Sequence, residues 1–136
     1  FKRRRCLVLA DGYYEWKKEG SGKQPFYIRF QDERAFAFAG LWERWSDADG
    51  QRMETCTIIT TDANPLTQPI HERMPVILRP DDYDLWLDPE FQNIGPLQQL
   101  LGPFESEEMT AEPVSTYVNK PTNDSPKCIQ EQRGLF

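Results

Sequence analysis

The stretch ADGYYEW, from Ala10 to Trp16, ends one strand-like segment at Gly12 and begins a second one that is crowded with aromatic side chains. A single carboxylate, Glu15, lies between Tyr14 and Trp16. A charged group among aromatic rings is costly to bury unless another group binds it or a reaction uses it. The position of Glu15 makes it the first candidate functional residue.

The residues around this stretch indicate short strands joined by turns. The segment FYIRF has the alternation of a half-buried strand, and ETCTIITT is rich in β-branched residues, which favour strands. A turn is expected at residues 18–25, where glycine and polar residues cluster. The expected strands cover residues 5–12, 13–18, 25–30, 35–45, 54–61 and 112–119.

Helix signals appear in the second half of the chain. Residues 79–88 place Pro80 and acidic residues before an apolar run, and residues 93–102 place Pro96 near the start and Gly102 past the end. Many strands and few helices predict an α+β fold with a strongly curved antiparallel or mixed sheet, or a barrel-like core. Because no linker divides the chain, residues 1–136 are expected to form a single domain.

The composition bounds the class of protein. The chain has 136 residues, of which 38% are hydrophobic, and no apolar run approaches the roughly 20 residues of a spanning helix. With no signal-peptide pattern and three cysteines far apart without a CxxC motif, a cytoplasmic location with reduced thiols and no metal site is expected. The net charge of −6 argues against broad duplex binding but leaves room for a local groove. The basic run at residues 2–5 is either part of such a groove or a solvated terminus.

The one histidine, His71, lies in PIHERMPVIL. Pro69 and Pro75 bracket it, so this loop is expected to hold one shape. The segment is not HExxH, and a zinc protease site is therefore not indicated. A lone histidine is often a structural hydrogen-bonding residue, but a carboxylate such as Glu15 and an imidazole can also share proton transfers, and Arg73 beside them can hold a phosphate.

Hydroxyl groups offer weaker signals. Thr60 and Thr61 end a strand-like segment, where they can either bind phosphate oxygens or simply cap the strand. Ser115 lacks the G-x-S-x-G elbow of a serine nucleophile.

Taken in order, the motifs of this chain resemble those of a known family, the SOS response-associated peptidase (SRAP) family. The resemblance covers nearly the whole chain and corresponds to the C-terminal two-thirds of that domain. The motifs that carry it are RRCLVLADGYYEWKK, KQPFYIRF, AFAGLWERW, TCTIITTDANPL, IHERMPVIL and VSTYVNKPTND.

The resemblance implies a DNA-damage function. Proteins of this family process abasic sites in single-stranded DNA: an N-terminal cysteine, exposed when the protein removes its own initiator methionine, forms a thiazolidine crosslink with the abasic aldehyde. The family motifs assign catalytic roles to Glu15 and His71 and DNA-binding roles to Arg73 and Thr60. They imply no cofactor and no metal. The expected partner is single-stranded DNA with abasic sites. The protein is expected to bind it as a monomer and not to associate with a membrane.

The chain also departs from the family pattern. The Met-Cys-Gly-Arg start and the N-x-R-x-E segment, which supplies a site asparagine, have no counterpart in the sequence, and Cys6 falls inside a predicted strand. The N-terminal part of the domain is therefore expected to be missing. If the chain is naturally truncated, the alternative function is a non-catalytic single-stranded DNA-binding module or an inactive remnant.

Overall fold

The computed structural model describes residues 1–131, whose contacts gather into two compact units. Unit 1 contains residues 1–10, 36–62 and 74–104. Unit 2 contains residues 11–35, 63–73 and, within the described part of the chain, 105–131. No helix of the described residues has the length and apolar composition needed to cross a membrane.

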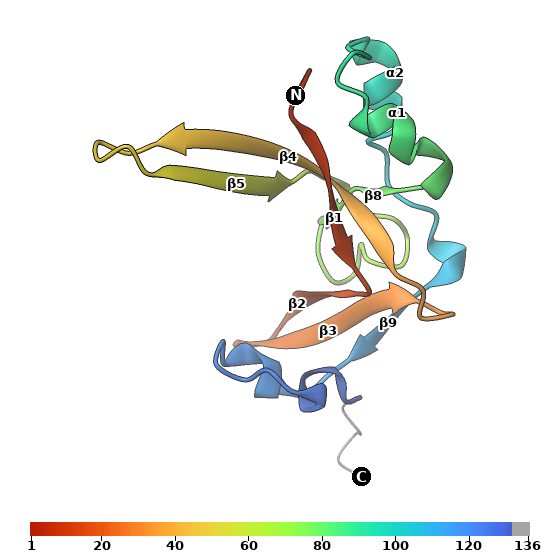
Figure 1. The fold of residues 1–136 in the computed structure, drawn as a ribbon. Helices are drawn as coiled ribbons and strands as arrows, with labels where there is room; N and C mark the ends of the chain where they lie inside the picture. Colours follow the sequence, from red (N-terminus) through yellow and green to blue (C-terminus); the bar gives the residue numbers. More distant parts are fainter. Residues whose placement is uncertain (132–136) are drawn as a thin grey trace. The chain divides into compact units, whose positions relative to one another are not determined.

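Unit 1 is an antiparallel sheet packed against short helices (Figure 1). Its strands follow the order β1-β4-β5, and β8 also pairs with β4. The helical segments η1, α1 and α2 follow β8 along the chain. The bounds are Arg5–Ala10 for β1, Phe36–Ser46 for β4, Arg52–Ile58 for β5, Ile77–Leu78 for β8, Pro80–Asp82 for η1, Tyr83–Leu87 for α1 and Ile94–Gln99 for α2.

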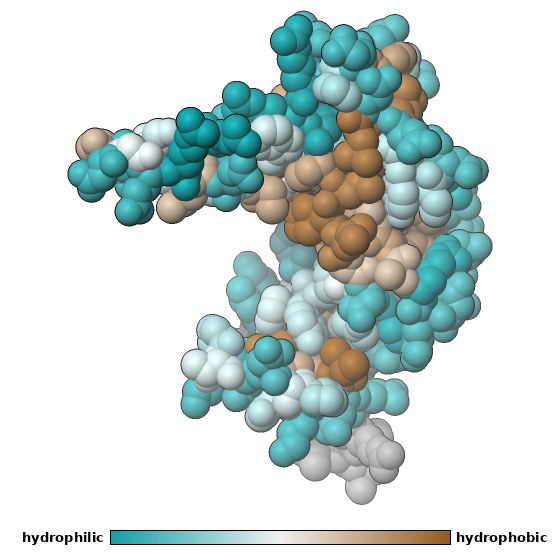
Figure 2. Space-filling view, viewed as in Figure 1, coloured by the Kyte–Doolittle hydropathy of each residue, from teal (hydrophilic) through white to brown (hydrophobic). Residues whose placement is uncertain are grey.

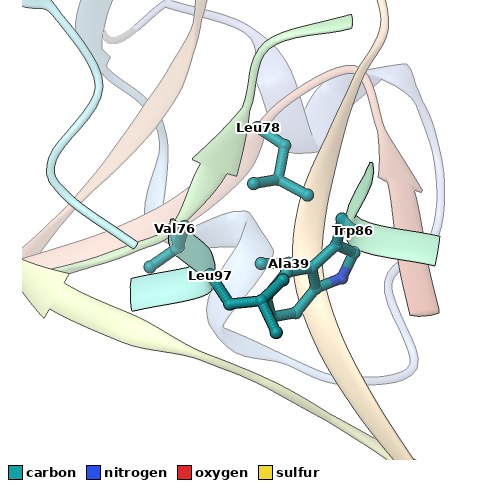
Figure 3. Packing of buried hydrophobic residues seen from close by; sticks show 5 residues of the cluster. All are labelled: Ala39, Val76, Leu78, Trp86 and Leu97. Carbon is teal, nitrogen blue, oxygen red and sulfur yellow. The ribbon is translucent and has the colours of Figure 1, made fainter. Parts of the chain in front are cut away.

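The core of unit 1 lies between the sheet and the two α-helices. Ala39 and Leu78 from the sheet and Trp86 and Leu97 from the helices are at most 2% exposed, and Val76 completes the cluster (Figure 3). Gly40 allows close strand packing beside this core, because a Cβ there would lie 2.9 Å from the Cys6 sulfur and 3.2 Å from a backbone oxygen. The continuously buried first half of β4 and the buried residues of the two helices thus produce one apolar layer.

A buried arginine fixes how the helices meet the sheet. Arg5, at the start of β1, is 6% exposed, and its guanidinium donates to five backbone carbonyls. The acceptors, with donor–acceptor distances, are Trp86 (2.5 Å), Asp88 (2.5 Å), Lys2 (2.6 Å), Phe91 (2.7 Å) and Phe1 (3.1 Å). Burial lowers the pKa of Arg5, and the charge of Asp88 opposes that shift. A second bond joins the same two elements with the roles exchanged: the indole of Trp86 in α1 donates to the carbonyl of Cys6 in β1 at 2.9 Å.

Unit 2 contains a three-stranded antiparallel sheet in the order β2-β3-β9 (Figure 1). The hairpin between β2 and β3 is tight, because Glu19 pairs with Gly22 and Gly20 adopts a positive φ of 57°. Ile28 and Phe30 of β3 are at most 1% exposed. The bounds are Tyr13–Glu19 for β2, Gly22–Phe30 for β3, Ser106–Glu108 for η2, Met109–Pro113 for β9, Thr116–Asn119 for η3 and Pro126–Ile129 for η4.

Two short strands, β6 (Thr60–Asp62) and β7 (Arg73–Pro75), pair with each other on either side of the loop that contains His71. The chain enters β6 through Ile59, whose N–H donates to Ala39 and whose carbonyl accepts from Val76. The first bond keeps Ile59 beside β4. The second bond, together with the donation of the Ala39 N–H to the Val76 carbonyl, inserts Val76 where the β4–β5 ladder would otherwise continue.

The α+β prediction is confirmed, and three local expectations need correction. The turn predicted at 18–25 shrinks to two residues, so that β3 begins at Gly22. The strand predicted at 54–61 is broken at Ile59 by the bonds just described. The strand predicted at 112–119 ends at Pro113, because the Ser115 hydroxyl accepts from the Tyr117 N–H and starts a helical turn.

Two broader expectations have different outcomes. The sequence predicted a strongly curved sheet or a barrel-like core. In the described residues the sheets are open and do not close into a barrel. The single domain expected over residues 1–136 stays a prediction. Cys6 lies in β1, as expected, and burial, with a smaller contribution from Cys56, raises the pKa of its thiol.

We predict that Arg5→Lys lowers the free energy of unfolding by about 3 kcal/mol, since a lysine ammonium has three donors and leaves buried carbonyls without partners. Urea unfolding followed by tryptophan fluorescence measures the change. The matched control is Arg3→Lys, an exposed position at which a change within about 0.5 kcal/mol is expected. Equal unfolding midpoints for the two variants would contradict a stabilising role for the Arg5 network.

Candidate functional site

Strand β2 determines which side chains surround Glu15. Because side chains alternate along a strand, Tyr13 and Glu15 share one face, and Tyr14 and Trp16 share the other. Glu15 is half-buried, lies opposite Phe26 of β3, and accepts a hydrogen bond from the Trp16 backbone N–H at 3.3 Å. The two aromatic residues next to Glu15 in the sequence are therefore not the rings that share its face.

Tyr13 shares the face of Glu15 with Phe26, the residue of β3 directly opposite Glu15. Burial raises the pKa of its phenol well above the ordinary value, and the negative charge of Glu15 raises it further. A phenol is neutral at physiological pH even without this shift. The shift indicates a poorly hydrated environment in which the phenol lies close enough to Glu15 to feel its charge.

The opposite face of β2 carries an aromatic cluster. The ring of Tyr14 lies 6.3 Å from that of Trp16 and 5.6 Å from that of Tyr27. The Trp16 indole donates to the side-chain oxygen of Asn119 at 2.7 Å. Sequence reasoning missed Asn119, which lies 103 positions away from Trp16 and carries no local signal of this contact.

The loop before β7 holds His71 through buried polar groups. Asn64 is 3% exposed, and its side-chain oxygen accepts from the backbone N–H groups of Leu66 and Thr67. The Thr67 carbonyl then accepts from the N–H groups of Ile70 and His71. The expected rigidity of this loop therefore has a further physical source besides the prolines, namely an Asx turn followed by a second turn.

The exposed imidazole of His71 contacts the backbone of Arg73. Its Nδ1 accepts from the Arg73 N–H at 3.1 Å and lies 3.2 Å from the Arg73 carbonyl oxygen. Since the backbone hydrogen already points at Nδ1, a second hydrogen on that nitrogen would crowd it. The neutral ring is therefore expected to carry its proton on Nε2, the atom that faces away from this turn.

Thr60 and Arg73 lie on the paired strands β6 and β7, and both are exposed. The structure thus joins His71 directly to Arg73. Within residues 1–131, no direct hydrogen bond or ion pair joins Glu15 to His71. That Glu15 and His71 act together in proton transfer stays a prediction.

The described residues contain no group of three or more histidine, cysteine or acidic side chains that could hold a metal ion.

The chain has one histidine, so the imidazole proton can be assigned without ambiguity. We predict that long-range ¹H–¹⁵N NMR spectra at alkaline pH show the Nε2–H tautomer of His71, because Nδ1 accepts from the Arg73 N–H. Replacing Asn64 by Ala should broaden the pattern toward a mixture of tautomers, since the turn that positions His71 loses its acceptor. A dominant Nδ1–H tautomer in the unmodified chain would contradict this geometry.

The family model for SOS response associated peptidase (SRAP) matches residues 1–121. The abasic site processing protein YoqW of Bacillus subtilis (strain 168) is 44% identical over 128 residues, which cover 93% of this chain and 57% of the relative. The abasic site processing protein HMCES of Gallus gallus is 38% identical over 148 residues, an alignment that covers 94% of this chain and 44% of the relative. The chain therefore spans about half the length of these relatives.

Solved structures share the fold of this chain. A crystal structure of a protein from Bacteroides thetaiotaomicron has a TM-score of 0.88 and 39% identity, over 97% of this chain and 58% of that one. A crystal structure of a protein from Bordetella bronchiseptica has a TM-score of 0.74 and 27% identity, over 82% of this chain and 55% of that one. Because the family model matches residues 1–121 of 136, the chain belongs to the SOS response-associated peptidase (SRAP) family.

Proposed function

We propose that this chain supplies the acid, the histidine and the DNA-contacting arginine of a protein that processes abasic sites in single-stranded DNA. The observation that carries the proposal is that the chain has both motifs and is similar to proteins named for abasic site processing. Glu15 of GYYEW lies on β2, His71 of IHERMP lies in the loop before β7, and Arg73 begins β7. YoqW is 44% identical over 93% of the chain.

The proposed chemistry needs an N-terminal cysteine from a preceding Met-Cys segment. After the methionine is hydrolysed away, the free amine condenses with the aldehyde of an abasic site and releases water. The thiol then adds to the resulting imine and closes a thiazolidine ring. We propose that these 136 residues are one part of such a domain, a proposal consistent with the 57% coverage of YoqW.

Each named residue has a role suited to its surroundings. Glu15 exchanges protons during methionine removal, beside a buried neutral phenol that excludes water. His71 presents its Nε2 to the reacting sugar, while the Arg73 N–H holds Nδ1. The guanidinium of Arg73 and the hydroxyl of Thr60, exposed on paired strands, are suited to phosphate oxygens.

The first test concerns Glu15 in a full-length SRAP protein that contains these residues behind a Met-Cys start. Glu15→Gln should slow methionine removal by about 10²–10⁴-fold, because it keeps the shape but removes the proton-exchanging group. Intact-mass spectrometry measures the fraction of processed protein. Thermal melting should change little, since the substitution leaves no cavity.

Glu19→Gln is the matched control, since Glu19 lies on the same strand face but is exposed at the end of β2. Its processing should be normal. If Glu15→Gln matures at the normal rate but melts at a much lower temperature, then Glu15 is a structural acid.

The second test concerns Arg73 and uses the 136-residue chain with single-stranded DNA. Arg73→Ala should weaken binding and lower the slope of log affinity against log salt by about 0.7, the contribution of one phosphate contact. Fluorescence anisotropy across a salt series measures both quantities.

The control for that test is Arg34→Ala, which removes an exposed arginine that is ion-paired with Asp32 and Glu108 in unit 2. It should leave the salt slope unchanged. Equal slopes for the unmodified chain and Arg73→Ala would remove Arg73 from the DNA contact.

A further inference from the structure

A second surface of the molecule has the features of a nucleic-acid site, and it lies entirely in unit 1. A cavity of about 570 Å³ opens where the segment before β1 passes the β4–β5 hairpin. Its size is in the ordinary range for ligand sites. The lining residues that matter here are Lys2, Arg3, Arg4, Trp42, Thr55 and Gln92.

The charge at this cavity is opposite to that of the chain. Arg4 is ion-paired with Glu43, but Lys2 and Arg3 are exposed and have no carboxylate partner within residues 1–131. The lining contains three basic side chains and one acidic side chain, in a chain whose net charge is −6. Cations without local partners beside a cavity favour an anionic ligand.

The backbone bonds of Arg5 hold these cations in place. Its guanidinium binds the Lys2 carbonyl at 2.6 Å and, on the far side, the carbonyls of Trp86 and Asp88. The segment that carries Lys2 and Arg3 is therefore fixed against the helices at its backbone, while the two side chains extend into solvent. A fixed backbone lowers the entropy cost of binding a ligand there.

An aromatic surface completes the chemistry of the cavity. The guanidinium carbons of Arg4 and Arg44 lie 5.4 Å and 5.7 Å from the centre of the Trp42 ring, which limits how that ring can turn. The Thr55 hydroxyl and the Gln92 amide are hydrogen-bonding groups in the same lining. Figure 2 shows that hydrophilic residues dominate the visible face of the hairpin, and every residue of β5 is exposed.

Cations that follow a backbone, with an aromatic ring for stacking, form the usual combination in single-stranded nucleic-acid grooves. We propose that this cavity binds single-stranded nucleic acid, with Lys2 and Arg3 on phosphates and a base against Trp42 and the two arginines that cover its ring. The proposal rests on the function proposed above and adds a site that is separate from Glu15, His71 and Arg73.

The test compares intact oligothymidylates of about 4 and about 16 nucleotides, the range that single-stranded DNA-binding grooves cover. Anisotropy is measured with the 136-residue chain and with the double variant Lys2→Gln/Arg3→Gln. The double variant should lose most of the affinity gained with the longer strand, and its salt slope on that strand should fall by about 1.4, the loss of two phosphate contacts.

The matched control is Lys18→Gln/Lys23→Gln, which removes two exposed charges that lie opposite each other on β2 and β3. It should keep both the length dependence and the slope. Thermal melting of each variant verifies that the fold is unchanged.

The possible outcomes separate the two proposals. If the chain binds DNA through Arg73 but Lys2→Gln/Arg3→Gln behaves like the control, the site at the cavity is overturned and the proposed function stands. If no strand binds at all, both proposals fail. If polyglutamate of matched charge competes as well as the oligonucleotide, the cavity binds anions without regard to stacking, and its assignment to a nucleic acid is overturned.

Discussion

The arrangement of unit 1 depends on the burial of one guanidinium. Removing Arg5 from water is expensive, and only the five carbonyls that surround it make that burial tolerable. Those carbonyls come from the segment before β1, from the end of α1 and from the connection to α2, so that one side chain ties three pieces of chain together. The position of the helices over the sheet, and of the basic segment beside the hairpin, follows from it.

Unit 2 uses small polar side chains for the same purpose. The buried Asn64 and Thr67 are 3% and 1% exposed, and between them they organise the turn that ends at His71. A buried amide satisfied by backbone donors specifies one loop conformation, because any other conformation would leave those groups without partners. This constraint delivers His71 and Arg73 in a fixed relation, which the prolines alone would not ensure.

The sequence predicted features that depend on local patterns. Alternation in FYIRF and β-branched residues in ETCTIITT identified strands, and IHERMP identified a constrained loop. Contacts across large separations were not visible: the partners of Arg5 include Trp86, and Trp16 binds Asn119. The basic run was treated as one unit, yet Arg5 is buried while Lys2 and Arg3 are exposed, because only position 5 faces the helices. The relation of Glu15 to His71 depends on such distant contacts as well, and its prediction rested on residue chemistry and the family resemblance rather than on any spacing in the sequence.

The overall negative charge shapes how such local sites would work. A chain of net charge −6 repels a polyanion at long range, but this repulsion is screened beyond about 10 Å at 0.1 M salt. Cations at a site act within that distance, and many others, such as Arg44 with Glu54, are neutralised by partners. Raising the salt therefore weakens the attraction between a site and the DNA and also relieves the repulsion between the DNA and the whole chain. The slope of log affinity against log salt for any one protein mixes both effects. A difference in slope between two variants of equal net charge cancels the global part, and what remains reports the phosphates contacted at the altered site.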